Sequence, residues 1–120
     1  MQPKIANVPD DLQYLFPLTP AVFFILFALA EGERHGYAIM QAIAVLSNGK
    51  FRMGPGTLYT TIQRLLELSL IEETATEAGG RRRYYRLCWT GRIVLKEEVA
   101  RMDALVRLAA DRKLAPQGGS

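Results

Sequence analysis

Side chains that bind phosphates and base edges gather in one part of the chain, between Lys50 and Arg86. The first half of this segment carries polar residues at helical spacing, namely Thr57, Thr60, Gln63 and Arg64. The second half carries three consecutive arginines directly after a Gly-Gly pair, namely Arg81, Arg82 and Arg83. Arginine and glutamine pair with base edges in the major groove, and threonine and arginine hold phosphates. The chemistry that this segment indicates is recognition of double-stranded DNA.

Residues suited to catalysis or metal binding are scarce. The chain has one histidine, His35, and one cysteine, Cys88, and it contains neither an HExxH motif nor a CxxC pair. A metal site within one chain needs more soft ligands than this. His35 falls at a predicted helix start, where capping or packing is the simpler role. We therefore expect no enzymatic activity, no metal and no cofactor.

The composition fits one small domain. A chain of 120 residues with 49% hydrophobic residues can bury a core without a metal or a disulfide. The net charge is only +3, but the segment 78–92 holds five arginines and no acid. A single cysteine fits a reducing compartment, and no signal peptide is visible. The apolar run 15–30 is too short to span a bilayer, so we expect a cytoplasmic protein without membrane contact.

The sequence predicts the helices that would position these side chains. Thr19 before Pro20 is a typical helix start, with threonine as the cap and proline in the first helical position. The helix that follows runs to about Glu31, is apolar nearly all round and should be central to the core. Asn48 and Gly49 tolerate positive φ and should end the second helix. The other helices are predicted over 35–47, 55–68 and 92–113.

The helix over 55–68 should turn one apolar face inward and one polar face outward. Its apolar residues follow an i, i+4, i+7, i+8 pattern, which makes one buried stripe of Leu58, Ile62, Leu65 and Leu66. At 100° per residue, the opposite side carries Thr57, Thr60, Gln63 and Arg64, with Tyr59 on the flank. We interpret this helix as a groove-reading helix; the alternative is an ordinary solvated face.

Two strand-like runs, 70–77 and 82–89, follow that helix and should form an antiparallel hairpin with its tip at 78–81. The arginines would then lie at or near the tip of a basic wing, against the DNA backbone or in the minor groove. The alternative is a soluble turn whose arginines pair with glutamates of the facing strand, with pairing expected for Arg83 or Arg86.

Trp89 ends the second strand-like run, on the same face as Tyr85 and Leu87. This position predicts that the indole lies in the core. The alternative is a surface on which a planar ligand stacks, close to the contact between two subunits.

The last helix carries apolar residues at spacings of 4, 3, 4 and 3, namely Leu95, Val99, Met102, Val106 and Ala109. This spacing is typical of a coiled-coil seam. A second, weaker stripe suggests that one face meets the chain's own core and the other meets a second subunit; the alternative is one broad intramolecular face. A two-fold dimer would place two reading helices ~34 Å apart, in successive major grooves.

The chain resembles the PadR family of transcriptional regulators over about residues 18–108. The stretches that carry the resemblance are HGYAIMQAI at 35–43, GPGTLYTTIQRLLELSLIE at 54–72 and GGRRRYYRL at 79–87. The resemblance implies a winged helix-turn-helix, a homodimer held by the C-terminal helix, and repression through operator DNA. It also implies that Thr57, Tyr59 and Arg64 contact DNA, as do Arg81 and Arg82, and that Tyr37 reaches a phosphate.

This chain departs from the family pattern at several positions. Relatives often have Ser, Pro and Lys where it has Gly54, Thr60 and Gln63, which leaves the operator sequence open. Relatives usually have Thr and an acid at Cys88 and Trp89. Because cysteine caps helices poorly, we expect the last helix to begin later, with Thr90 as its cap. Some relatives sense aromatic or cationic drugs, so a small hydrophobic or aromatic effector is a further candidate partner.

The expected fold is mainly α with a small β-hairpin (α+β), a winged helix-turn-helix with a C-terminal dimerisation helix. We divide the chain into an N-terminal arm (1–17), the winged domain (18–89), the dimerisation helix (90–113) and a disordered tail (114–120). Two alternatives to a DNA-binding regulator stay open. One is a winged-helix module that binds ligands or proteins without DNA, and the other is a different winged-helix class such as a metal sensor.

Overall fold

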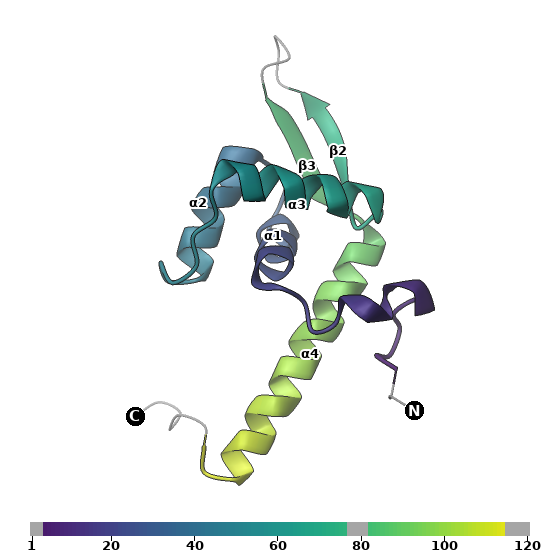
Figure 1. Cartoon of the computed structure of the whole chain (residues 1–120), viewed down its shortest axis with the longest axis vertical. Coiled ribbons are helices and arrows are strands. Elements are labelled where there is room, and N and C mark those ends of the chain that lie inside the picture. Colours follow the sequence, from purple (N-terminus) through teal and green to yellow (C-terminus); the bar gives the residue numbers. More distant parts are fainter. Residues whose placement is uncertain (1–3, 77–81, 115–120) are drawn as a thin grey trace.

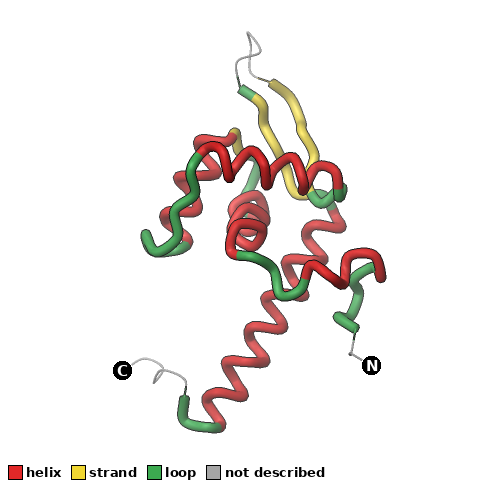
Figure 2. The backbone as a smooth tube through the Cα atoms, in the orientation of Figure 1, coloured by secondary structure: helices red, strands yellow, loops and turns green. Residues whose placement is uncertain are grey.

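The computed structural model describes residues 4–76 and 82–114, and Figure 1 shows the arrangement of its elements. The described chain is mainly helical, with strand confined to a small sheet (Figure 2). In chain order the elements are the 3₁₀ helix η1 (Asp10–Leu15), α1 (Pro20–Ala30), β1 (Arg34–His35), α2 (Gly36–Leu46), α3 (Pro55–Glu67), β2 (Ile71–Thr76), β3 (Arg83–Leu87) and α4 (Trp89–Asp111).

Helix α1 is the centre of the fold, as its uniform apolarity predicts. It begins at Pro20, and the Thr19 hydroxyl accepts a hydrogen bond from the Val22 N–H at 3.2 Å. Ile25 and Leu26 are completely buried. The helices α2, α3 and α4 and the strand β3 pack around α1 (Figure 1). Helix α1 therefore fixes the positions of these surrounding elements.

Helix α2 begins where His35 caps it: the imidazole Nδ1 accepts a hydrogen bond from the Ala38 N–H at 3.2 Å. The capping role predicted for this histidine is confirmed. Asn48 and Gly49 have positive φ directly after the helix, as predicted from their residue types.

Helix α3 lies across α1 and turns its apolar stripe inward (Figure 1). Leu58, Ile62 and Leu65 are buried, and Leu66 packs against the same core from its edge. Proline at the first helical position starts the helix after Gly54. The predicted division of this helix into an inner and an outer face is therefore correct.

The sheet has three antiparallel strands in the order β1-β3-β2. The predicted hairpin is present, with Ile71 opposite Leu87 and Glu73 opposite Tyr85, and it projects beyond α3 (Figure 1). Its predicted tip lies outside the described residues. Strand β1 was not predicted because two residues are too short to show a period, yet it places His35 beside the hairpin, opposite Tyr84.

Helix α4 begins at Trp89, with Cys88 as its N-cap residue and without a side-chain capping bond. The predicted start at a Thr90 cap is wrong. The chain turns earlier because the Cys88 N–H bonds to the Leu70 carbonyl at 3.0 Å and Gly91 packs on that same carbonyl. A Cβ at Gly91 would come within 2.1 Å of the oxygen, so only glycine fits this approach.

This early turn also decides the position of Trp89. Its side chain leaves the face shared by Tyr85 and Leu87 and is 75% exposed in the first turn of α4. The prediction that Trp89 belongs to the core is therefore wrong, because the strand ends two residues before it.

The segment before α1 packs against the rest of the chain. Val8 and Leu12 are buried, and the Gln13 amide bonds to the backbone of Ile5 and Val8. Asp10 and Asp11 begin a helical turn, as predicted, and it is the 3₁₀ helix η1. The expectation of a loose arm is wrong for residues 4–17, because buried leucine and valine side chains tie the segment to the core. The expected tail, 114–120, lies outside the described residues except for Leu114.

The first half of α4 belongs to the core and the second half projects from it (Figure 1). Val94 and Leu95 are buried with Glu98, whose carboxylate accepts hydrogen bonds from the Leu18 N–H at 2.7 Å and from Arg101. This buried, fully hydrogen-bonded carboxylate fixes the helix to the start of α1. A helix of 23 residues is about 35 Å long, so about half of it extends past the body of the chain.

Candidate nucleic-acid interface

The outer face of α3 presents the side chains that the sequence singled out for DNA. All of them are exposed: Thr57, Tyr59, Thr60, Gln63 and Arg64. Gln63 lies 3.4 Å from the Glu67 carboxylate one turn on, a weak contact at an exposed site. These side chains are therefore accessible to a groove, and their contact with DNA stays a prediction.

Arg64 has a neighbour that the sequence did not reveal. Its guanidinium carbon lies 5.9 Å from the centre of the Tyr14 ring, and its Nη2 donates to the Tyr14 hydroxyl at 3.4 Å. The two residues are 50 positions apart, so no local pattern could predict this contact. Tyr14 therefore brings the N-terminal segment to the edge of the candidate interface.

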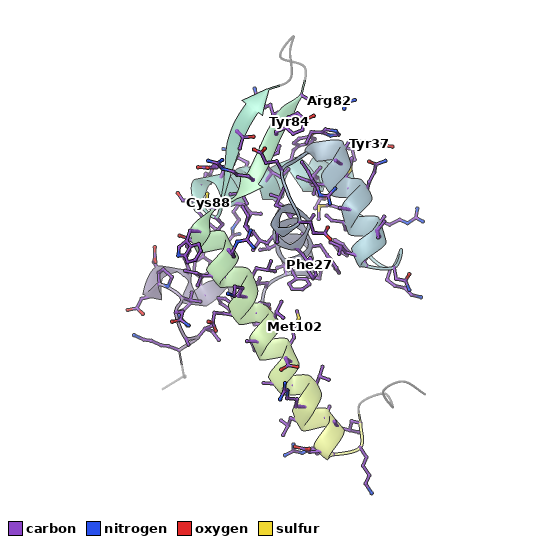
Figure 3. The ribbon with its side chains drawn as sticks, turned by 180° about the vertical axis from the view of Figure 1, so that it is seen from behind. Phe27, Tyr37, Arg82, Tyr84, Cys88 and Met102 are labelled. Atoms are coloured by element: carbon purple, nitrogen blue, oxygen red, sulfur yellow. The ribbon has the colours of Figure 1, made fainter. Side chains whose placement is uncertain are left out.

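A hollow of about 350 Å³ lies where α2, α3 and the hairpin meet. It is lined by His35, Gly36, Tyr37, Tyr59, Arg82, Arg83 and Tyr85. Gly36 makes this packing possible, because a Cβ there would lie 2.3 Å from the Tyr59 hydroxyl oxygen. Figure 3 shows Tyr37 and Arg82 at the same end of the molecule. The structure thus joins two predicted tyrosines to two predicted arginines.

The described hairpin arginines have two kinds of neighbour. Arg83 and Arg86 lie beside glutamates, and Arg82 and Arg83 line the hollow. Arg86 forms an ion pair with Glu72, which raises the pKa of the guanidinium, and Arg83 lies 3.8 Å from Glu73. Pairing with glutamate was predicted for Arg83 or Arg86, and both arginines have such a partner. Exposed ion pairs contribute little, with a median of about 0–1 kcal/mol, so phosphates can replace such partners. Arg81 lies outside the described residues.

Arg82 turns toward α2, where its Nη1 lies 3.1 Å from the His35 Nε2. The His35 ring also packs edge-on against Tyr84, with the ring centres 5.4 Å apart. From its place at a helix start, His35 was predicted to have a capping or packing role. Its contact with the wing depends on β1 and could not be read from local sequence.

The described residues offer little to catalysis or to a metal. Burial raises the pKa of the Cys88 thiol, and the Glu72 carboxylate raises it further, so the sulfur stays protonated and a poor nucleophile. Residues 4–76 and 82–114 contain no cluster of three or more His, Cys, Asp or Glu able to hold a metal. In the same part of the chain, no helix combines the length and apolarity that crossing a bilayer requires.

The projecting half of α4 carries apolar side chains that the chain's own core does not cover. Val99 is 45% exposed and Val106 is 57% exposed, with Leu105 and Leu108 exposed beside them. Leu95, by contrast, lies in the core, and Met102 and Ala109 are half-buried. The predicted seam therefore begins inside the monomer and continues onto an uncovered surface.

Three core helices, the third with a polar outer face, and an adjoining arginine-bearing hairpin define a winged helix-turn-helix, a DNA-binding class of fold. The family model described as the transcriptional regulator PadR-like family matches residues 25–97. The chain belongs to this family of transcriptional regulators, as its motifs predict.

A relative agrees with this assignment, and two solved structures share the fold. The chain is similar to the transcriptional regulator Rv3488 of Mycobacterium tuberculosis, at 37% identity over 84 residues that cover 69% of this chain and 76% of that protein. A PadR family transcription regulator from Clostridium difficile R20291 has a similar structure, with a TM-score of 0.66, 24% identity, and coverage of 78% of this chain and 97% of that one. Bacillus subtilis PadR, in complex with operator DNA, has a TM-score of 0.59 and 20% identity, and covers 69% of this chain and 47% of that one.

Proposed function

We propose that this regulator is a repressor that binds operator DNA as a homodimer. The observation that carries the proposal is that Tyr59 of α3 and the hairpin arginines Arg82 and Arg83 line the same hollow. Bacillus subtilis PadR binds operator DNA, which supports the same function for this family member. Contact with DNA also agrees with the cytoplasmic location expected from the sequence.

In the proposed complex α3 enters the major groove. Gln63 and Arg64 are long enough to reach base edges, while Thr57 and Thr60 hold phosphates beside the groove. Tyr37 and Tyr59 lie at the other end of this surface, next to the wing. The wing arginines, including Arg81 outside the described residues, bind the backbone or the minor groove.

The proposed dimer forms through the projecting half of α4. The buried face of this helix, around Val94 and Leu95, continues at helical spacing into Met102 and Leu105 and then passes beyond the core. Uncovered apolar residues in a row mark a contact surface. A second copy of the same helix would cover them, with Val99, Met102, Val106 and Ala109 between the subunits. Leu95 would support that contact from within the core.

We further propose that a small hydrophobic or aromatic effector controls DNA binding. The one aromatic residue of α4 is Trp89, which is exposed at the junction of the hairpin and the proposed dimerisation helix. A planar ligand stacked there would touch both the wing and α4. In the proposed dimer, α4 sets the distance between the two α3 helices that enter the DNA grooves. This position supports Trp89 as the ligand contact.

Salt dependence tests the proposed function. If a dimer neutralises about six or more phosphates, its affinity for duplex DNA should fall ~10³-fold between 50 and 200 mM salt. The measurement is fluorescence anisotropy of a labelled 30-bp duplex over a series of salt concentrations. An absence of binding, or an affinity that ignores salt, would favour a ligand-binding or protein-interaction module instead.

A further inference from the structure

The hollow between α2, α3 and the hairpin is lined by hydrogen-bond donors. Every lining residue other than Gly36 carries a side-chain N–H or O–H group: His35, Tyr37, Tyr59, Arg82, Arg83 and Tyr85. Among these described lining residues none has a carboxylate. Burial raises the pKa of the Tyr85 hydroxyl, and Glu73 raises it further, so this group keeps its proton. Such a lining suits an anion.

The hydrogen bond that caps α2 determines which nitrogen of His35 faces the hollow as a donor. Its Nδ1 accepts from the Ala38 N–H at 3.2 Å. A neutral imidazole has one acceptor nitrogen and one N–H. With Nδ1 as the acceptor, we assign the proton of the neutral ring to Nε2.

The His35 Nε2–H faces another donor. The Arg82 Nη1 lies 3.1 Å away, and a guanidinium has no acceptor. The two N–H groups cannot serve each other, but an oxyanion can accept from both. A phosphate oxygen suits this role because charge-assisted hydrogen bonds are roughly twice as strong as neutral ones.

The imidazole is held in place before any anion arrives. His35 pairs with Tyr84 across β1 and β3, and the two rings meet edge-on. The capping bond to Ala38 holds the other side of the ring. A preorganised donor loses little side-chain entropy on binding.

We propose that this hollow is a phosphate site in which His35 Nε2–H and the Arg82 guanidinium hold the same phosphate group, with the Tyr37 and Tyr59 hydroxyls beside it. This inference rests on the proposed function in assigning the phosphate to the DNA backbone. Free inorganic phosphate is the other source of the same chemistry.

The variant His35→Asn separates the capping role from the phosphate role. Asparagine is as good an N-cap as any residue, but it is too short to replace Nε2. With the folding of the variant checked by thermal unfolding, its affinity for a 30-bp mixed-sequence duplex at 50 mM salt should fall at least ~10-fold, since a hydrogen bond to a charged group is lost in each subunit. The salt slope should stay unchanged because Arg82 still neutralises the phosphate.

Arg82→Gln gives the complementary result. Affinity should again fall, but here the salt slope should drop by about 0.9 for each subunit. Wild-type affinity retained by a folded His35→Asn protein would overturn the phosphate site while leaving the proposed function intact. A wild-type protein that binds no duplex at all would overturn the proposed function.

Because the chain has a single histidine, the protonation of its imidazole can be measured directly in the wild-type protein. Nitrogen-15 NMR of the imidazole should show a proton on Nε2 and a shift of that resonance when duplex DNA binds. A shift with millimolar inorganic phosphate but none with duplex DNA would overturn the assignment to the backbone. No shift with either ligand would overturn the site itself.

Discussion

Replacing Val99 and Val106 with glutamate should split the proposed dimer and greatly weaken operator binding. The two side chains lie two turns apart on one side of α4 and are largely exposed in the monomer. The monomer should therefore stay folded, whereas two like charges would be buried against a second copy. A monomer binds DNA through one α3 helix and loses the avidity of two linked helices. Its affinity for the operator should therefore fall by about 10²–10⁴-fold. Sedimentation equilibrium and gel-shift titration measure the two effects.

A matched control is the pair Ala100→Glu and Ala104→Glu. These exposed alanines lie on a different side of the same helix and add the same charge. We expect the control protein to remain dimeric and to bind DNA. A dimer that survives in the Val99/Val106 protein would show that this surface is not the subunit contact.

Replacing Arg81 and Arg82 with alanine should weaken binding to every duplex by a similar factor. Phosphate contacts carry no sequence information, so preference among sequences should persist. If all four arginines of a dimer contact phosphates, the loss is on the order of 10³-fold at physiological salt, and the salt slope falls by about 3.6. Anisotropy titrations against two unrelated duplexes over several salt concentrations measure both quantities.

The control for the wing is Lys96→Ala with Arg107→Ala, which removes the same charge from an exposed side of α4. Its affinity should change by far less than that of the wing variant, because nearby charges matter more than net charge under screening. Equal losses in the two proteins would show that net charge, and not the wing, drives binding.

Much of the fold follows from local sequence. The stripe of α3, the Thr19 cap and the prolines at two helix starts depend on residues within one or two turns of one another. Local chemistry was enough there because neighbouring residues make the deciding contacts. The start of α4 did not follow the preference of helices for a threonine cap. The close contact of Gly91 with the Leu70 carbonyl, 21 positions away, determined the start instead.

The candidate site was predicted only in part, for the same reason. The outer face of α3 follows from its period, but the contact of His35 with Arg82 joins residues 47 positions apart through a two-residue strand. The α4 pattern shows a related limit. A heptad spacing cannot tell a face that meets the chain's own core from one that meets a second subunit, and Leu95 belongs to the first.

Selection of bound sequences from a pool of random duplex DNA is the sharpest test of whether this protein binds an operator as a dimer. A two-fold dimer with one reading helix in each subunit should enrich an inverted repeat whose half-sites are centred about 10 bp, or a small multiple of this, apart. Enrichment of such a repeat by the wild-type protein, and its loss in the Val99→Glu/Val106→Glu protein, is the predicted result. A pool that stays random after repeated rounds would contradict the account of this protein as a dimeric operator-binding repressor.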